Sequence, residues 1–334
     1  MEVYAGLDLH STNTYVAMIN EDNKVLYKQR HGNDVPTILS ALDPFKKDIQ
    51  GVVVESTYNW YWLVDALMDA GYRVHLANVS AIKQYEGHKQ IDDRRSSLWL
   101  ANLLRLNILP TGYIYPKEEH PTRDLLRKRL HLVRHRTSHI LSVKNILARN
   151  LGVRMKSEEV KKLNTSEIKT LFPDPEMRVA LAASVGLIAH LQNEIKGIEA
   201  MITRKIKVRK EFTKLLTMPG IGQILGLTIM LEVGHIDRFP TVGNYSSYCR
   251  CVRSIRTSNG KITGYGNRKS GNKYLSWAYV EAANFARRFH EVVRSYYERK
   301  VARTNRIVAI KAVSHKLARA SYYVMRDNVD YDQA

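Results

Sequence analysis

The sequence predicts an α/β domain at its N-terminus followed by all-α regions. Short apolar runs of the strand type fall within the first 118 residues, and residues 119–212 contain no convincing strand. Long stretches with apolar residues at three- and four-residue spacing follow, as in long helices. The chain has 334 residues, 44% hydrophobic and 25% charged, which corresponds to about two ordinary globular domains and excludes a disordered or collagen-like chain.

The elements of residues 1–118 follow from their apolar patterns. Alternation at Val3, Ala5 and Leu7, then the runs TYVAMIN and KVLYKQ, indicate three strands joined by hairpins. We then expect, in order, a helix over NDVPTILSALDPF, a buried strand over GVVVE (51–55), a helix over WYWLVDALMDAGY, a strand over RVHLA and a helix from Asp93. This order, an antiparallel meander followed by parallel crossovers, is typical of a ribonuclease H-like domain.

Residues 119–212 predict a helical segment. One long helix is expected from Pro121, in its first turn, to Gly152, which ends it. After a looser stretch with Pro173 and Pro175, a second long helix covers 177–207. Two such helices predict an antiparallel hairpin, an arrangement that often mediates association, so we expect a homo-oligomer, either a dimer or a tetramer.

Residues 213–334 predict a third, mostly helical domain. It opens with LLTMPGIGQILGLTIMLEVGHIDRF, whose PGIG turn resembles a helix-hairpin-helix. The backbone amides of such a turn can hold a phosphate, which makes Gly220 and Gly222 candidate nucleic-acid-binding residues. A polar, glycine-rich stretch, SIRTSNGKITGYGNRKSGNKY, follows, and helices continue to the end.

The charge is distributed unevenly. The chain has 52 Lys and Arg against 32 Asp and Glu, a formal net charge of +20. Residues 1–70 are acidic, whereas 123–149 and 250–319 are strongly basic. Basic helix faces can simply be solvated, but two separate basic segments favour a polyanionic partner, with nucleic acid ahead of a membrane.

Targeting signals and cysteine sites are not evident. No apolar run approaches the length needed to cross a bilayer, and the start MEVYAGLDLH is not a signal sequence, so we expect the chain in the cytoplasm, associated with the nucleoid. Cys249 and Cys251 cannot build a disulfide framework or a closed zinc site, which favours core packing.

Carboxylates at strand ends are candidate metal ligands. Asp8 ends the first strand and Glu55 ends GVVVE, and these strands are neighbours in a ribonuclease H-like sheet. Asp92 and Asp93 open the later helix and can bring a third carboxylate to the same edge. Such a cluster favours Mg²⁺ or Mn²⁺, which can stabilise an in-line phosphoryl transfer. Strand-end acids are also common on surfaces, and His10 beside Asp8 is favoured as a surface residue.

Ser258 lies in the polar stretch, in the sequence T-S-N-G-K. A hydroxyl among cations can act as a nucleophile at phosphorus, but Asn259-Gly260 is a strong hairpin signal, and the residues alone favour Ser258 as a turn residue. The glycines at 264, 266 and 271 indicate a loop that approaches a phosphate backbone closely. The candidate nucleic-acid-binding cations of this stretch are Arg253, Arg256, Lys261, Arg268, Lys269 and Lys273.

Five blocks of the sequence resemble a known family. They are GLDLHSTNTYVA, VVVESTYNWYWLVDALMDAGYRVHLAN, DDRRSSLWLANLLRLNILPTGYIYPKE, LTMPGIG with EVGHIDRF, and SNGKITGYGNRKSGNKYLSWAYVEAANFA. In this order, over essentially the whole chain, they are similar to the DEDD transposases of insertion sequences. More narrowly they resemble the IS-one-ten family and its IS-eleven-eleven group, relatives of the Piv DNA invertase.

The resemblance implies a fold, an activity and site residues. It implies a RuvC-like domain over 1–118, a helical coiled-coil insertion over 119–212 and a C-terminal transposase domain over 213–334. Asp8, Glu55 and Asp93 match the first three acids, which bind Mg²⁺ or Mn²⁺, and Ser258 matches a serine nucleophile that links covalently to DNA. The implied partners are a guide RNA, called bridge or seek RNA, and donor and target DNA. Acids and serine fall in different predicted domains, so we expect a site shared between subunits.

One position departs from the family pattern. The pattern around the third acid is K-x-T-D-D-R-x-D-A, whereas this chain has KQIDDRRSS over 89–97, so Ser96 stands at the fourth acid and Ser97 at the usual alanine. A serine cannot supply a charged ligand. Two further hypotheses therefore stand beside an RNA-guided DNA recombinase: a catalytically inactive RNA- and DNA-binding homologue, and a metal-dependent junction nuclease that uses the acids alone.

Overall fold

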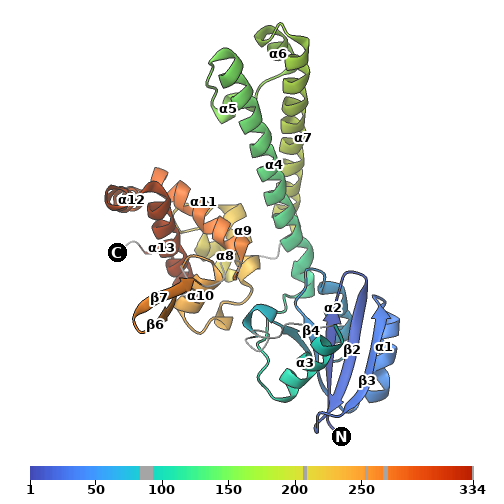
Figure 1. The fold of residues 1–334 in the computed structure, drawn as a ribbon. Helices are drawn as coiled ribbons and strands as arrows, with labels where there is room; N and C mark the ends of the chain where they lie inside the picture. Colours follow the sequence, from blue (N-terminus) through green and yellow to red (C-terminus); the bar gives the residue numbers. More distant parts are fainter. Residues whose placement is uncertain (83–92, 206–208, 253–254, 266–269, 333–334) are drawn as a thin grey trace. The chain divides into compact units, whose positions relative to one another are not determined.

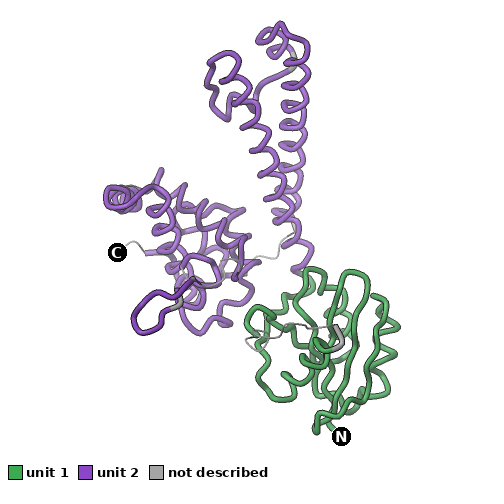
Figure 2. The backbone as a smooth tube through the Cα atoms, viewed as in Figure 1, with its two compact units in different colours: residues 1–118 green, residues 119–334 purple. Residues whose placement is uncertain are grey.

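The chain divides into two compact units, residues 1–118 and residues 119–334 (Figure 2). The structure is a computed structural model that describes residues 1–82, 93–205, 209–252, 255–265 and 270–332. Each unit is described in turn.

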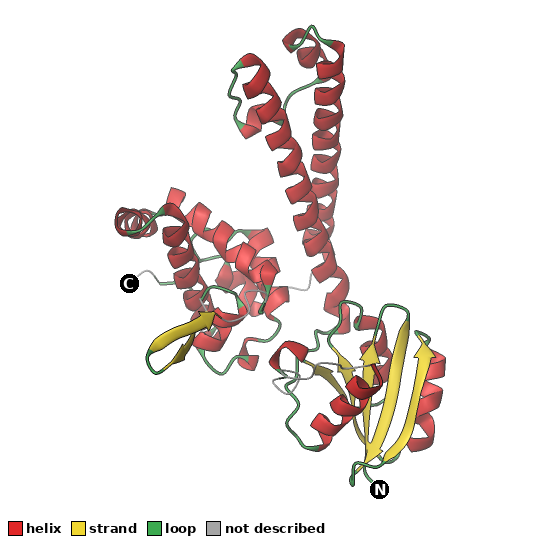
Figure 3. Ribbon diagram, in the orientation of Figure 1, coloured by secondary structure: helices red, strands yellow, loops and turns green. Residues whose placement is uncertain are grey.

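The first unit is a five-stranded sheet with helices on both faces (Figures 1 and 3). The strand order is β3-β2-β1-β4-β5; β1 pairs antiparallel with β2, β2 antiparallel with β3, and β4 parallel with both β1 and β5. The elements are β1 (Val3–Leu9), β2 (Asn13–Asn20), β3 (Val25–Gly32), α1 (Val35–Leu42), β4 (Ile49–Glu55), α2 (Tyr61–Asp69), β5 (Val74–Ala77) and α3 (Asp93–Arg105). The predicted meander followed by parallel crossovers is confirmed.

Two apolar layers cover the two faces of this sheet. Alternate side chains of β1 and β4, such as Leu7 and Val54, pack with Ile38 of α1 and Leu63 of α2. On the opposite face, Val53 packs with Leu100 and Leu103 of α3. Successive strand residues point to opposite faces, so the side chains of β1 and β4 contribute to both layers. Among the described helices of this unit, α3 covers the face opposite α1 and α2.

Local signals set the helix ends of this unit. Asp34 caps α1, accepting a hydrogen bond from the Thr37 amide at 2.9 Å, and Gly71 adopts φ +84° after α2. The predicted helix over 33–45 is shorter than expected. It ends at Leu42 and continues as a 3₁₀ turn, Asp43–Phe45, because Pro44 cannot extend an α-helix.

The second unit begins with two long antiparallel helices. They are α4 (His120–Leu151), which ends at Gly152 with φ +66°, and α7 (Pro175–Lys205). The two short helices α5 (Ser157–Val160) and α6 (Thr165–Leu171) connect them, so the predicted hairpin is closed by a longer segment than a turn. Buried residues of α4, α6 and α7, among them Val143, Ile168 and Leu181, form a core between these helices.

The rest of the second unit is mostly helical, as predicted. Its helices are α8 (Lys210–Leu215), α9 (Gln223–Val233), α10 (Val242–Tyr248), α11 (Lys273–Phe289), α12 (Glu291–Arg303) and α13 (Arg306–Asp327), with a hairpin of β6 (Ile255–Ser258) and β7 (Lys261–Tyr265). α9 is apolar all round and lies inside the core; nine of its eleven residues are buried. Tyr245, Cys249 and Tyr279 are fully buried in the same core.

None of the described helices combines the length and the apolar character needed to span a bilayer.

Candidate functional site

Asp8 lies one residue before the end of β1, and Glu55 ends the neighbouring parallel strand β4. β1 and β4 lie in parallel register, and their pairing runs up to Leu7 with Val54, the residues directly before the two acids. Side chains at paired positions of adjacent strands point to the same face. Asp8 and Glu55 therefore share one face of the sheet, at one edge.

That face is the one covered by α3. A β-carbon on Gly6, two residues before Asp8, would lie 2.0 Å from the Ser97 carbonyl oxygen, and one on Gly51 would lie 3.0 Å from the Leu104 side chain. Because Gly51 precedes Glu55 by four residues, α3 runs from the carboxyl ends of the strands at Ser97 towards their amino ends at Leu104. Its first residue, Asp93, lies one turn before Ser97. The backbone thus places Asp8, Glu55 and Asp93 at the same end of the same face; the side chain of Asp93 and all of Asp92 lie outside the described part.

Asp8 is a buried carboxylate with spare hydrogen-bonding capacity. It is 2% exposed, and its Oδ1 has no hydrogen-bond partner among the described residues. His10 Nε2 lies 3.6 Å from this oxygen, with the His10 side chain 40% exposed. His10 is thus partly exposed, in keeping with the surface position expected for it, and its ring also lies beside Asp8.

Two asparagines that the sequence did not single out hold the turn after β1. Asn33 and Asn59 each donate a side-chain N–H to the His10 carbonyl oxygen, at 2.9 Å and 3.1 Å. They follow β3 and β4, so they tie the turn to two other strands of the sheet. This fixes the backbone around Asp8 and brings His10 back towards it.

The acids fit a hard divalent cation in chemistry. A buried carboxylate oxygen without a hydrogen bond is costly unless a cation or another donor reaches it, and carboxylates are the ligands that Mg²⁺ and Mn²⁺ prefer. Among the residues whose side chains are described, which leave out Asp93, no three His, Cys, Asp or Glu groups converge on one point.

Ser258 lies at the tip of the β6–β7 hairpin. Asn259 and Gly260 form a two-residue turn with φ +48° and +72°, as their sequence predicts, and Ser258 pairs with Lys261 across it. Both side chains are exposed, and as a directly paired couple they point to the same face of the hairpin. The hydroxyl therefore stands in solvent with an ammonium group on its side of the ribbon.

The other predicted cations of this stretch are only partly placed. Lys273 begins α11, with its ammonium nitrogen 5.1 Å from the centre of the Tyr274 ring. Arg256 is paired with Gly264 in the hairpin, but its side chain is not described. Arg253, Arg268 and Lys269 lie outside the described residues.

Packing explains the first glycine of the PGIG turn. Gly220 has φ +77°, and a β-carbon there would lie 2.1 Å from the Ala282 carbonyl oxygen of α11, whereas one on Gly222 would meet nothing within 4 Å. The Ile221 amide donates to Met218 O at 3.2 Å within the turn. Gly220 is thus required for the contact with α11, independently of any phosphate.

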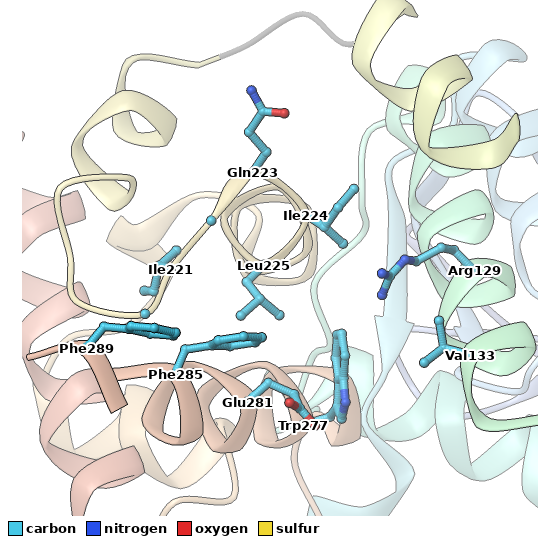
Figure 4. A pocket seen from close by; sticks show the side chains of 12 residues that line it. Arg129, Val133, Ile221, Gln223, Ile224, Leu225, Trp277, Glu281, Phe285 and Phe289 are labelled. Atoms are coloured by element: carbon cyan, nitrogen blue, oxygen red, sulfur yellow. The ribbon is translucent and has the colours of Figure 1, made fainter. Parts of the chain in front are cut away.

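A groove beside this turn is mainly apolar. It has a volume of about 700 Å³, and its lining includes Ile221, Leu225, Trp277, Phe285 and Phe289. Figure 4 shows the two phenylalanine rings beside Ile221 and Leu225, with Trp277 nearer to Arg129. Arg129 forms an ion pair with Glu199 at 2.7 Å. This lining suits apolar contacts better than a phosphate.

The two cysteines behave as predicted from their number. Cys249 is fully buried in the core, and burial raises the pKa of its thiol well above the usual value. Burial also raises the pKa of Cys251 to about 12. Both thiols stay protonated at neutral pH and serve packing.

Two family models match the chain. The one described as "Transposase IS116/IS110/IS902 family" matches residues 213–298, and the IS110-type DEDD model described as "Transposase" matches residues 5–150. A relative from Streptomyces coelicolor, "Insertion element IS110 uncharacterized 43.6 kDa protein", is 24% identical over 138 residues. That match covers 41% of this chain and spans 34% of the relative's length, about a third.

Proposed function

Because the chain belongs to the IS110 family of transposases and carries both of its domains, we propose that it is an RNA-guided DNA recombinase. It would cut DNA strands and rejoin them without net hydrolysis. The acids of the first unit and the serine of the second would carry the chemistry.

The placement of the acids carries this proposal. Asp8 near the end of β1 and Glu55 at the end of β4 lie on the face that α3 covers, and α3 begins with Asp93 at the same end. The three acids belong to three separate elements and stand 38 or more positions apart in the chain. Three carboxylates gathered at this edge would repel one another unless a cation offset their charge.

A divalent cation would be held by Asp8, Glu55 and Asp93. When bound, Mg²⁺ or Mn²⁺ supplies charge stabilisation at a phosphate. Asp8 contributes a buried oxygen with no other hydrogen-bond donor among the described side chains, and the turn fixed by Asn33 and Asn59 holds this carboxylate in place. The His10 ring lies beside this carboxylate, with Nε2 3.6 Å from Asp8 Oδ1.

Ser258 would be the nucleophile. Its hydroxyl oxygen forms a bond to the phosphorus of a DNA strand while the bond from phosphorus to a sugar oxygen breaks; the hydroxyl proton leaves the serine and the departing sugar oxygen takes one up. Attack by another sugar oxygen reverses the step and rejoins the DNA. An exposed position at a hairpin tip, next to Lys261, suits attack on a large anionic substrate.

The charge distribution and the family support nucleic-acid partners. The 17 Lys and Arg of residues 250–319, against three acids, surround the serine hairpin in sequence. We propose that they contact donor and target DNA and a guide RNA, and that copies of the chain assemble into a dimer or tetramer.

One observation favours a second candidate, an inactive RNA- and DNA-binding homologue. Ser96, at the position of the fourth family acid, lies on α3 three residues after Asp93, on the same side of the helix. A missing carboxylate there weakens the cation site. A junction nuclease that uses the acids alone would have no need of Ser258.

Substitution of the two reactive groups tests the proposal. Ser258→Ala and Asp8→Asn should each abolish strand exchange in cells, and Ser258→Ala should also abolish a covalent protein–DNA adduct. Thr257→Ala, next to the serine, and Asp69→Asn, an exposed acid of the first unit, are the controls and should leave both readouts unchanged. Strand exchange by Ser258→Ala at the wild-type level would refute the serine mechanism. If the wild type cuts DNA without forming an adduct, and Asp8→Asn loses this cutting, the result would favour the nuclease.

Binding assays test the partners. The purified chain should prefer RNA transcribed from the noncoding DNA beside its own gene to a control RNA of equal length, and affinity should fall steeply as salt rises because each Lys or Arg contact releases counterions. Equal affinity for both RNAs at moderate salt would contradict guidance by RNA.

A further inference from the structure

The hairpin that carries Ser258 makes few contacts of its own. Among the described elements, β6 and β7 pack extensively only with each other. Ile255 and Ile262, which a core would cover, are 47% and 59% exposed. A lone two-stranded hairpin is marginally stable in water, so the position of Ser258 depends on what holds the two ends of the segment.

The segment that carries the hairpin, residues 249–271, has its two ends at one point. It follows α10, which ends at Tyr248, and it is followed by Asn272; Arg250, near its start, adopts φ +55°. The Arg250 guanidinium donates to the Gly271 carbonyl oxygen at 2.8 Å and 3.0 Å, and the Asn272 amide donates to the Tyr248 carbonyl oxygen at 2.6 Å. The backbones touch so closely that a β-carbon on Gly271, where φ is +85°, would lie 2.5 Å from the Tyr248 oxygen.

Asn272 connects this closure to the core. Its Oδ1 accepts hydrogen bonds from the amides of Tyr274 and Leu275, at 2.8 Å and 3.1 Å, and so caps α11. Its Nδ2 donates to Glu232 Oε2 at 2.7 Å. One side chain therefore fixes both the start of α11 and its attachment to α9.

Glu232 is a buried carboxylate shared by three elements. It is 2% exposed, on the otherwise apolar helix α9. Besides Asn272, it accepts hydrogen bonds from Arg123 at 2.9 Å and from Arg127 at 2.6 Å, both on α4. Burial alone would raise its pKa, but the hydrogen bond from Arg127 and the charges of both arginines outweigh burial and lower it.

Arg127 reaches α11 directly as well. Its guanidinium lies 4.4 Å from the centre of the Tyr274 ring, two residues after Asn272. The helices α4, α9 and α11 are thus joined around Asn272, which directly follows the segment that carries Ser258.

We propose that Glu232 and Asn272 are positioning residues for Ser258. Through Asn272, the buried Glu232 fixes the end of the segment that carries the serine hairpin and ties it to α4. This inference rests on the proposed role of Ser258 as nucleophile. The alternative is that the cluster stabilises the junction of the three helices without affecting the hairpin.

The variant Asn272→Ser separates these roles. A serine still caps α11 with its oxygen but has no amide to donate to Glu232. Asn305→Ser is the matched control: Asn305 caps α13, accepting from the Val308 amide at 3.0 Å, and its side chain is exposed. Glu232→Gln is a second variant that weakens the same tie from the other side.

Amide hydrogen exchange of the full-length chain gives a readout independent of activity. In Asn272→Ser, amides of 255–265 and 270–276 should exchange about tenfold faster than in wild type, while those of α13 and of the sheet of the first unit stay unchanged. Strand exchange in cells should fall about tenfold, with DNA affinity within about twofold. Asn305→Ser should change none of these.

Two results would overturn the proposal. One is that the hairpin amides of Asn272→Ser exchange their hydrogens at the same rate as those of Asn305→Ser. The other is that the hairpin amides of the wild type exchange as fast as those of an unstructured peptide. If Glu232→Gln fails to fold, Asn272→Ser decides alone, because it keeps the cap. DNA strand exchange that survives Ser258→Ala would refute the proposed function. The amide hydrogen-exchange measurement would still report whether the cluster fixes the hairpin.

Discussion

Gly6 of β1 and Ser97 of α3 are in contact through their backbones: a β-carbon on Gly6 would lie 2.0 Å from the Ser97 carbonyl oxygen and 2.8 Å from the Ala101 amide nitrogen. Ser97 is fully buried at this crossing. The contact lies two residues before Asp8 on the strand and one helical turn after Asp93. It therefore sets how close the helix start comes to the sheet edge that bears the acids.

Gly6→Ala should destabilise the first unit strongly. The added methyl group meets backbone atoms, which cannot rotate away, so α3 must shift or the unit must unfold, at a cost of about 3 kcal/mol or more. Gly32→Ala, where a β-carbon meets nothing within 4 Å, is the control and should stay within about 0.5 kcal/mol. Thermal or urea unfolding of both variants measures this; equal stability would show that α3 does not approach β1 closely.

Gly220→Ala and Gly222→Ala should differ although they lie in one turn. Alanine at 220 faces a carbonyl oxygen at 2.1 Å and a left-handed backbone, so we expect a loss of about 3 kcal/mol. Alanine at 222 has room, and its cost should stay within about 1 kcal/mol.

The same pair tests phosphate binding at this turn. If Gly222 brings the backbone close to DNA or RNA, Gly222→Ala should weaken nucleic-acid binding while the melting temperature stays near that of wild type. Unchanged affinity would remove Gly222 from the interface and leave the turn a packing element.

Ser96→Asp should raise recombination by restoring a carboxylate at the fourth family position. Ser96 is part-exposed on α3, on the side of Asp93, so an added carboxylate has room and lies one turn from the third acid. A better-held cation can contribute several kcal/mol to a transition state, which corresponds to orders of magnitude in rate.

Paired recombination assays with and without Mg²⁺ measure this gain. Ser97→Asp is a poor substitute because Ser97 is fully buried against Gly6, and it should fail to fold. Full activity of the natural chain with no gain from Ser96→Asp would show that three acids suffice.

Glu232 should make the second unit sensitive to acid. Its pKa is lowered in the folded chain from an ordinary value of 4.5. A carboxyl whose pKa falls on folding stabilises the protein above its unfolded pKa, and this stabilisation is lost as the pH drops through the folded value. The contribution is therefore complete at neutral pH and declines below about pH 4.5.

Glu232→Gln should cost about 3 kcal/mol at neutral pH, since it removes the buried negative charge that pairs with Arg123 and Arg127. The difference in melting temperature between wild type and variant should shrink as the pH is lowered from 7 towards 3. A difference that is constant over this range would mean that the carboxyl is not ionised in the folded chain.

Much of the architecture was predictable from local pattern. Val3, Ala5 and Leu7 point to the face of β1 that lies under α1 and α2, whereas Gly6 and Asp8 point to the face under α3. Asn259-Gly260 makes a tight turn because both residues tolerate positive φ. The sequence also predicted the end of β4 at Glu55, and it placed the end of β1 at Asp8, one residue before the observed end at Leu9. The role of Ser258, in contrast, came from family resemblance, since a serine before such a turn is ordinary in composition.

By itself, the sequence determined the order of helices and strands, the strand-end acids and the hairpin below Ser258, because each depends on residues within a few positions of one another. Only the tertiary structure decided that the backbone of Ser97 packs against Gly6 and that the His10 ring lies beside Asp8. It also decided that Glu232 accepts hydrogen bonds from Arg123 and Asn272. Glu232 reads as one polar residue at the end of an apolar helix, and its partners lie 109 positions before it and 40 after it. Contacts over such separations leave no periodic trace in a chain, because they depend on how finished elements pack and not on how each element forms.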